Sequence, residues 1–440
     1  MKVLLINDSS SDPNWGDRAA AFALKAMIRE AGGEITASIS ELELGTSTFG
    51  RRTTHLEPSA DPGTTPTIAF GARGGAKALA KKWTPPILWE TVRSVAGRLN
   101  LGPSRTVIPA NWEGFEKAAS SVAENAEIWP DLFRAVEEAD VVIVHGDGCM
   151  MGNGLVARTE LFLSYLIKKY LGRPVIIVNH TADFSDPDLR RIAQKVYPLF
   201  DDIVFRDPIS PNRCSEFCAG RYVPDTAFRF GPLAPAVWLP VARRPGYFDV
   251  WPDTAEFDPG EPYLCMGGSS ALGAASHPSE LTKGFALLAG HIRSIYRGQI
   301  VLTVADPMDE LIFRPIAAAL ELPLIGLTTP VQQAVDILGN AEAYIGGRWH
   351  SGIFALRGGA PIVALSAKTF KMQALSQMAG LSPTTFDIWK VGEEKADIGR
   401  QVLEYLGGGE ELRKRLRAWA EASARESRGN VAYLTGWPTR

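Results

Sequence analysis

The sequence has few of the residues that bind metal ions or form disulfide bonds. Its 440 residues include only 4 cysteines and 6 histidines. Cys214 and Cys218 lie close together, but the segment RCSEFCAG around them supplies no second pair of ligands for a structural zinc ion. The sequence therefore predicts reduced thiols and no metal site.

Long apolar runs and a strong net charge are also missing. No apolar stretch approaches the roughly 20 residues needed to cross a bilayer. The formal net charge of -3 provides no general attraction for nucleic acid. The first residues, MKVLLINDSS, turn polar too early for a signal peptide and fit a buried first strand. We expect a globular cytoplasmic protein that does not bind nucleic acid.

The order of apolar segments predicts two α/β domains. In the first, residues 1–240, the strand-like KVLLIND, a helix-like segment and the strand-like EITASI form a βαβ unit. From about 45 to 130 the pattern lapses, which we interpret as an insertion containing one or two helices. A proline-rich linker is expected over 241–262, a second α/β domain over 263–425 and a tail over 426–440.

Two doubly wound domains joined by one linker resemble the glycosyltransferase-B architecture, in which two Rossmann-like domains face a cleft. Ligands of such α/β sheets bind outside the carboxyl ends of the strands. Polar residues in the turns that follow the strands are therefore the candidates for substrate binding and catalysis.

The turn after the first strand contains the motif Asn14-Trp-Gly-Asp17. Asparagine and aspartate suit a helix start and Gly16 suits a tight turn, so local capping explains the motif about as well as function does. In the functional interpretation, Asp17 accepts a proton from an attacking hydroxyl, while Asn14 and Gly16 contact the acceptor of a transferred group.

A strand in the middle of the first domain ends in the glycine-rich turn HGDGCMMGNG. Glycine lets the backbone approach a ligand closely, but the turn lacks the Lys-Ser/Thr of a P-loop and the spacing of a dinucleotide fingerprint. His145 is explained equally well by packing or hydrogen bonding. In the functional interpretation, His145, Gly146 and Asp147 contact the acceptor.

Arg206 follows the strand-like segment DDIVF. An arginine at the buried end of a parallel strand needs an anion, which is either Asp207 or a ligand. Asp207-Pro208 alone could start a helix with proline in its first turn.

The segment AYIGGRWHSGIFALR places Arg348, Trp349, His350 and Ser351 between a strand and a helix. A helix N-terminus offers unpaired N–H groups and the positive end of the helix dipole, which favour an anion. Lys371 follows the next strand and brings another cation to the same sheet edge. A surface arginine and a core histidine are the alternative interpretation.

Together these motifs resemble the polysaccharide pyruvyl transferase family. That family has Asn-x-Gly-Asp, a glycine-rich middle turn, Arg-Asp-x-x-Ser, Pro-Asp-x-Ala-Phe, and Arg-x-His-x-x-Ile followed by Gly-x-Pro and a lysine. The matching residues are Asn14, Gly16, Asp17, Gly146, Gly148, Arg206, Asp207, Ser210, Pro224, Asp225, Ala227, Phe228, Arg348, His350, Ile353, Gly359, Pro361 and Lys371. The motifs keep their order over most of residues 1–45 and 135–390, whereas the segment 45–130 has no counterpart.

The resemblance implies transfer of pyruvate from phosphoenolpyruvate to a sugar diol of a cell-surface or exported glycan. The product is a cyclic ketal, phosphate is released, and no metal or organic cofactor is required. His350 is the expected general acid, and Asp17 is the expected base across the cleft. The expected donor-binding residues are Arg206, Arg348, Trp349, Ser351 and Lys371.

Two other functions stay open. A nucleotide-sugar-dependent glycosyltransferase would use the same architecture, but it needs a carboxylate for the ribose and a pocket that stacks the base. A non-catalytic glycan-binding protein is the other alternative, against which the joint presence of Arg206, Arg348 and His350 argues. The acceptor sugar and the oligomeric state stay open as well.

The insertion interleaves basic residues with tryptophans, as in Lys81-Lys82-Trp83. A solvated, partly helical segment explains this composition. The alternative is an acceptor platform, because tryptophan stacks on sugar rings and basic residues attract an anionic glycan or a lipid-linked sugar. That interpretation predicts peripheral contact with the inner face of the cell membrane.

Overall fold

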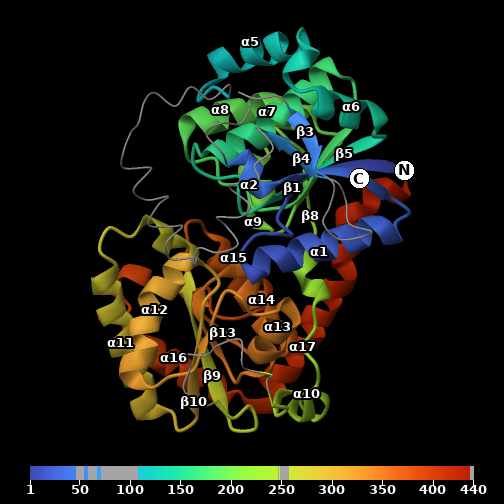
Figure 1. Cartoon of the computed structure of the whole chain (residues 1–440). Coiled ribbons are helices and arrows are strands. Elements are labelled where there is room, and N and C mark those ends of the chain that lie inside the picture. Colours follow the sequence, from blue (N-terminus) through green and yellow to red (C-terminus); the bar gives the residue numbers. More distant parts are fainter. Residues whose placement is uncertain (46–53, 58–66, 71–107, 246, 248–256, 437–440) are drawn as a thin grey trace. The chain divides into compact units, whose positions relative to one another are not determined.

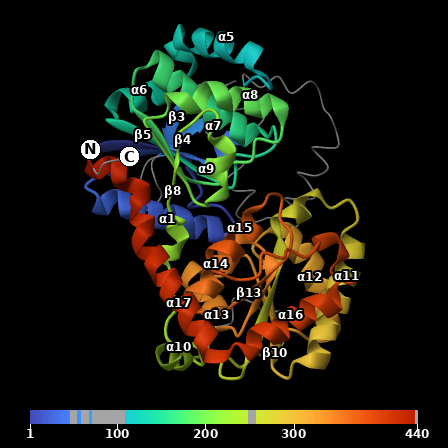
Figure 2. The same ribbon diagram turned by 180° about the vertical axis from the view of Figure 1, so that it is seen from behind.

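The computed structural model describes residues 1–45, 54–57, 67–70, 108–245, 247 and 257–436. The chain forms two compact units (Figures 1 and 2). Unit 1 comprises Met1–Asp12, Ala20–Thr226 and Ser427–Arg440, and unit 2 comprises Pro13–Ala19 and Ala227–Glu426. The short segment Pro13–Ala19 thus belongs to unit 2, although its neighbours in sequence on both sides belong to unit 1.

Unit 1 is built on an 8-stranded sheet in the order β3-β4-β2-β1-β5-β6-β7-β8. Neighbouring strands are parallel, except that β3 pairs antiparallel with β4. The strands are β1 (Lys2–Asp8), β2 (Glu34–Ser40), β3 (Thr54–Glu57), β4 (Thr67–Phe70), β5 (Val141–Asp147), β6 (Val175–His180), β7 (Asp202–Phe205) and β8 (Arg221–Tyr222). Central strands β5 and β6 are buried throughout, which explains their continuous apolar sequences.

The helices of unit 1 cover both faces of this sheet (Figure 1). They are α1 (Trp15–Glu30, whose first turn belongs to unit 2), α2 (Glu41–Leu44), α5 (Trp112–Ala123), α6 (Pro130–Glu138), α7 (Leu155–Tyr170), α8 (Pro187–Val196) and α9 (Ile209–Cys214). Short 3-10 turns are η1 (Ala126–Ile128), η2 (Tyr197–Leu199) and η6 (Ser427–Thr435). The tail expected over 426–440 therefore folds as η6 in unit 1 up to Thr435.

The expected insertion contains both a helix and strands. Asn111 caps α5 by accepting a hydrogen bond from the amide of Gly114. Phe115 of α5 packs edge to face on Phe162 of α7, with ring centroids 5.2 Å apart, so α5 belongs to the core of unit 1. The strands β3 and β4 were not predicted. Residues 46–53, 58–66 and 71–107, including Lys81-Lys82-Trp83, lie outside the described residues.

Unit 2 is built on a 5-stranded parallel sheet in the order β11-β10-β9-β12-β13. Its strands are β9 (Tyr263–Ser269), β10 (Gln299–Thr303), β11 (Leu324–Ile325), β12 (Tyr344–Gly347) and β13 (Ile362–Ala364). Its helices are α10 (Pro235–Ala242), α11 (Pro278–Ile295), α12 (Pro307–Leu320), α13 (Val331–Asn340), α14 (Trp349–Arg357), α15 (Lys371–Met378), α16 (Lys395–Gly407) and α17 (Gly409–Glu426). Short 3-10 turns are η3 (Thr226–Arg229), η4 (Ser270–Ala274) and η5 (Ile388–Lys390).

The segment before β9 differs from the expected linker over 241–262. The chain enters unit 2 at Ala227, and α10 reaches to Ala242. Helix α13 holds the segment ahead of α10, because Asp336 accepts a hydrogen bond from the amide of Leu233 at 2.8 Å and Asn340 donates one to the Leu233 carbonyl at 3.1 Å. Residues 246 and 248–256 lie outside the described residues.

The basic run RKRLR of α17 has a structural role. Arg413 donates to the carbonyl of Ala341, Arg415 to that of Ala379, and Arg417 to that of Gly358. These carbonyls end the helices α13, α15 and α14, respectively. The arginines therefore satisfy carbonyls that lack helical partners and complement the negative ends of three helix dipoles.

Among the described helices, none combines the length and apolar character needed to cross a bilayer. The largest fully buried side chains include those of Trp15, Trp129, Trp238 and Trp349.

Glu160 of α7 is expected to make the stability of unit 1 depend on pH. It is fully buried, and burial raises the pKa of Glu160 well above its ordinary value, with repulsion from Glu41 and Asp147 adding to the shift. At a pH between its unfolded and folded pKa values, Glu160 is therefore protonated in the folded protein and ionised in the unfolded chain. The free energy of unfolding then falls as pH rises above the unfolded pKa, by up to about 1.4 kcal/mol per pH unit.

Replacing Glu160 with glutamine should remove this fall, which thermal unfolding between pH 5 and 8 can measure. The exposed Glu138 of α6 provides the matched Glu→Gln control. Equal pH slopes for Glu160→Gln and the wild-type protein would show that Glu160 is ionised in the fold.

Candidate active site

The strand order of unit 2 reverses between β9 and β12, where doubly wound sheets bind their ligands. Arg348 directly follows β12 and is the N-cap of α14, so Trp349, His350 and Ser351 form the first turn of that helix. The amides of a first helical turn have no acceptor within the helix. The predicted strand–turn–helix arrangement around Arg348 and His350 is therefore confirmed.

The loop after β1 is anchored in unit 2 by Trp15 and Arg18. The Trp15 side chain is buried, its Nε1 donates to the carbonyl of Val304 at 2.8 Å, and its ring stacks on Phe354 of α14. Arg18 donates to the carbonyl of Thr329 at 3.1 Å. The sequence placed this loop on the acceptor side, in the first domain. The structure corrects that placement, because these contacts belong to unit 2.

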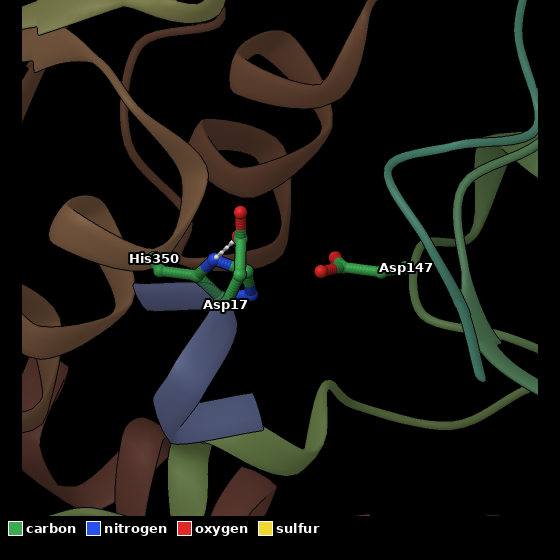
Figure 3. A group of neighbouring side chains, drawn as sticks. All are labelled: Asp17, Asp147 and His350. Atoms are coloured by element: carbon green, nitrogen blue, oxygen red, sulfur yellow. Dashed lines mark ion pairs between the residues drawn. The ribbon is translucent and has the colours of Figure 1, made fainter. Parts of the chain in front are cut away.

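Asp17 and His350 form an ion pair (Figure 3), with 3.0 Å between Asp17 Oδ1 and His350 Nδ1. The His350 side chain is only 7% exposed and that of Asp17 is 24% exposed. The expectation that Asp17 lies across a cleft from His350 is therefore wrong. A carboxylate bonded to one ring nitrogen fixes the orientation of the imidazole and leaves proton transfer to the other nitrogen.

Gly16 is the residue that allows this pair to form. A Cβ atom at Gly16 would lie only 2.6 Å from the Cβ of His350, so any larger residue would push the two segments apart. Asn14 sets the turn, because its side-chain oxygen accepts a hydrogen bond from the Gly16 amide at 2.9 Å. Asn14 and Gly16 thus shape the loop that delivers Asp17.

Replacing Gly16 with alanine is expected to displace Asp17 from His350. A misplacement of about 1 Å at a catalytic group can cost 10²-fold in rate, so we expect a loss of that order in turnover. Gly290 of α11 provides the control, because its added Cβ would meet nothing within 4 Å. Equal steady-state rates for Gly16→Ala and Gly290→Ala would refute this role for Gly16.

Arg348 is held by the fully buried Asp309 and lies near the partly exposed Asp306. Its Nε and Nη2 donate to the two carboxylate oxygens of Asp309 at 3.0 and 2.7 Å, and Nη1 lies 3.6 Å from Asp306. Burial raises the pKa of Asp309 to about 6, although the charge of Arg348 opposes this shift. The two hydrogen bonds place the Asp309 carboxyl against the Nε and Nη2 edge of the guanidinium. The Nη1 edge makes only the longer pair with Asp306, whose side chain is 36% exposed.

The other predicted donor-binding residues of unit 2 differ in exposure. Trp349 is 2% and Ser351 1% exposed, so both side chains belong to the core of unit 2. Lys371 is partly exposed and opens α15. The backbone amides of Trp349 and Ser351 lie in the first turn of α14, where an α-helix provides no acceptor for them.

Arg206 lies in unit 1 with its own carboxylates. Its Nη1 forms ion pairs with Asp147 and, at 3.1 Å, with Asp225, while Nε donates to Thr181. Asp207 instead accepts hydrogen bonds from the amides of Ile209 and Ser210 at the start of α9. The sequence predicted that the anion beside Arg206 is either Asp207 or a ligand. The structure shows Asp147 and Asp225 as its ion-pair partners.

Backbone strain marks the carboxyl ends of three neighbouring strands in unit 1. Asn7, Asp147 and Asn179, at the ends of β1, β5 and β6, all have positive φ angles of 68°, 41° and 56°. Non-glycine residues adopt this conformation at an energetic cost, which often marks functional sites. The strand order of this sheet reverses between β1 and β5, so the strained residues lie at the kind of position where ligands of such sheets usually bind.

His145 and Gly146 support this strained edge from the interior. His145 is fully buried, its carbonyl accepts a hydrogen bond from Asn7, and its Nε2 lies 3.0 Å from the Asn179 amide nitrogen. A Cβ at Gly146 would lie 2.7 Å from the Cβ of His180, so this glycine permits packing between strands. His145 and Gly146 therefore help to fix the backbone at the carboxyl ends of β1, β5 and β6.

A profile of the polysaccharide pyruvyl transferase family matches residues 14–369. The chain belongs to the polysaccharide pyruvyl transferase family. The match begins at Asn14 and includes the Asp17–His350 pair and both buried arginine clusters. For this family member, a search of curated protein sequences finds no significant match.

Solved structures show that this pyruvyl transferase family member has the glycosyltransferase-B fold. The UDP-GlcNAc 2-epimerase from Neisseria meningitidis bound to UDP-GlcNAc has a TM-score of 0.54 and 13% identity, over 99% of this chain and 100% of that chain. The OtsA apo structure has a TM-score of 0.54 and 12% identity, over 98% of each chain. The spinosyn rhamnosyltransferase SpnG has a TM-score of 0.50 and 16% identity, over 99% of this chain and 100% of that chain. The predicted fold class is confirmed.

Proposed function

We propose that this protein transfers the pyruvyl group of phosphoenolpyruvate to a sugar diol of a cell-surface or exported glycan, forming a cyclic ketal. The observation that supports the proposal best is the Asp17–His350 pair at the start of α14, inside the region that matches the family. A histidine held by a carboxylate is suited to proton transfer near neutral pH.

The reaction needs one proton at carbon and two new C–O bonds. His350 donates a proton through Nε2 to the methylene carbon of phosphoenolpyruvate, which becomes the methyl group. One acceptor hydroxyl adds to the neighbouring carbon, and its proton returns to Nε2 of His350. The C–O bond to phosphate then breaks, and the second hydroxyl adds at the same carbon to close the ketal, its proton passing to the released phosphate. Phosphate leaves with the electron pair of the broken bond.

The donor anion is assigned to unit 2. The Nη1 edge of Arg348 pairs with the carboxylate of phosphoenolpyruvate, while Asp309 holds the opposite edge in place. The first-turn amides of α14 and the ammonium of Lys371 bind the phosphate. We reassign Arg206 from donor binding to the support of Asp147, because two carboxylates already neutralise it.

The acceptor is assigned to the strained edge of unit 1, next to Asp147. Its carboxylate is 8% exposed and is oriented by Arg206. Asn14 and Gly16 do not contact the acceptor in this proposal; they shape the loop that carries Asp17. His145 and Gly146 likewise support the end of β5, next to the acceptor. A location in the cytoplasm, with peripheral membrane contact, is part of the same proposal.

Asp17 is assigned as a positioning residue that orients His350, in place of the role of acceptor base. Replacing Asp17 with asparagine should lower kcat by roughly 10–100-fold, the loss that follows removal of the hydrogen-bond partner of a metal-bound histidine. The KM for phosphoenolpyruvate should stay within about twofold. Steady-state kinetics that show a raised KM with unchanged kcat would instead make Asp17 a substrate ligand.

The decisive experiment is phosphate release from phosphoenolpyruvate in the presence of a panel of glycans. We expect release only with glycans that present a free diol, and we expect the rate to persist in the presence of a metal chelator. Hydrolysis of nucleotide sugars in place of phosphoenolpyruvate would favour the glycosyltransferase alternative. Glycan binding without turnover of any donor would favour a non-catalytic protein.

A further inference from the structure

The segment from Gly231 to Ala242 has the sequence GPLAPAVWLPVA, without a single charged residue. Such a run normally lies in a core, yet the side chains from Leu233 to Val237 are all exposed, as is Pro240. Val237 is 56% and Leu233 37% exposed. Runs of consecutive exposed apolar residues are uncommon unless they bind something.

The segment is firmly attached to unit 2, so its exposure is a fixed feature of the fold. Trp238 is 1% exposed and donates from its indole nitrogen to the hydroxyl of Tyr247 at 3.1 Å. Gln332 of α13 donates to the carbonyl of Gly231 at 3.1 Å, and Asp336 accepts from the amide of Leu233. Trp238 and Ala242 face inward, which leaves Val237 and Pro240 outward on α10.

Two exposed arginines, Arg243 and Arg244, end this apolar surface. Arg243 pairs at 3.3 Å with Asp258, but both side chains are at least half exposed, and such a pair is weak in water. An apolar helix face bordered by arginines is typical of segments that lie in the interface of an anionic bilayer. The apolar side chains enter the headgroup region while the arginines contact lipid phosphates.

We propose that α10, with the preceding residues from Leu233, docks on an anionic membrane surface. A second copy of the chain is a poorer occupant, because a stable protein interface takes about 20–30 residues from each side. The exposed apolar run supplies only Leu233–Val237 and Pro240. Prolines at 232, 235 and 240 also prevent the run from adding to a sheet. A bilayer requires neither a large area nor a complementary shape.

The proposal is independent of the reaction and is tested by vesicle sedimentation. The full-length protein should sediment with phosphatidylcholine vesicles that contain phosphatidylglycerol, and much less with phosphatidylcholine alone. Val237→Asp should reduce the bound fraction at least tenfold. Arg244→Ala should weaken partitioning about fivefold at low salt, in line with roughly 1 kcal/mol per basic residue at an anionic surface.

Leu287→Asp is the matched control, because Leu287 on α11 is also exposed, at 57%, but lies outside the run. This variant should bind vesicles like the wild-type protein, and the melting temperature of each variant shows that it folds. No sedimentation of the wild-type protein, or equal losses for Val237→Asp and Leu287→Asp, would overturn the proposal. So would a change from dimer to monomer in Val237→Asp with unchanged vesicle binding, which would identify a second copy as the occupant.

Discussion

Replacing His350 with glutamine is expected to lower the turnover of pyruvyl transfer by roughly 10²–10⁴-fold, the usual contribution of general acid–base catalysis. Glutamine preserves much of the size of the side chain but cannot release a proton to carbon. The affinity for phosphoenolpyruvate should change little, because the proposed anion ligands are Arg348, Lys371 and the α14 amides. Single-turnover rates and donor binding, measured separately, check both parts of this expectation.

His277 provides the matched control for this substitution. It lies before α11 in unit 2, is exposed, and makes no side-chain cap hydrogen bond. His277→Gln should therefore keep the wild-type rate. If His350→Gln keeps full turnover and binds phosphoenolpyruvate more weakly, His350 is a ligand of the phosphate and another group supplies the proton.

Replacing Arg348 with methionine is expected to destabilise unit 2 by about 3–5 kcal/mol. The cost arises because Asp309, which is fully buried, loses the cation that neutralises it. Chemical denaturation of the variant and the wild-type protein measures this difference in the free energy of unfolding. A loss below about 1 kcal/mol would mean that Asp309 is protonated in the fold.

The double variant Arg348→Met with Asp309→Leu separates stability from donor binding. Replacing a buried ion pair with apolar residues of similar size is often neutral for stability, so most of the lost stability should return. Phosphoenolpyruvate should still bind roughly 10–150-fold more weakly, as expected for a lost charged hydrogen bond of about 1.5–3 kcal/mol. A double variant with wild-type affinity would assign Arg348 to structure alone.

The sheets could be predicted from sequence because their strands are short, continuous apolar runs with strong local signals. The strand before Arg348 and the helix after it were predicted in this way, and so was the position of Arg206 after β7. The short strands β3 and β4 were missed, since their surroundings are rich in threonine, proline and glycine. Strand β3 is the edge strand of its sheet, and an edge strand can form with a weaker apolar pattern than a central strand.

The partners of the charged residues could not be predicted, because they depend on tertiary contacts. Asp309 is 39 residues from Arg348 in sequence, and nothing in the segment PMDE marks it as buried. Asp225 had a signal, since it belongs to the Pro-Asp-x-Ala-Phe motif, but no spacing linked it to Arg206. The pairing of Asp17 with His350 likewise required a segment near the N-terminus to fold with unit 2.

The most direct test of the proposed reaction is to incubate the protein with phosphoenolpyruvate and a diol-bearing glycan in D₂O and to analyse the product by mass spectrometry. We expect a glycan that has gained pyruvate less water, with one solvent deuteron in the new methyl group and one phosphate released per ketal. The His350→Gln variant should form this product at least 100-fold more slowly, as expected for loss of the general acid. Phosphate release without ketal, or a glycan extended by a sugar from a nucleotide sugar, would contradict the account.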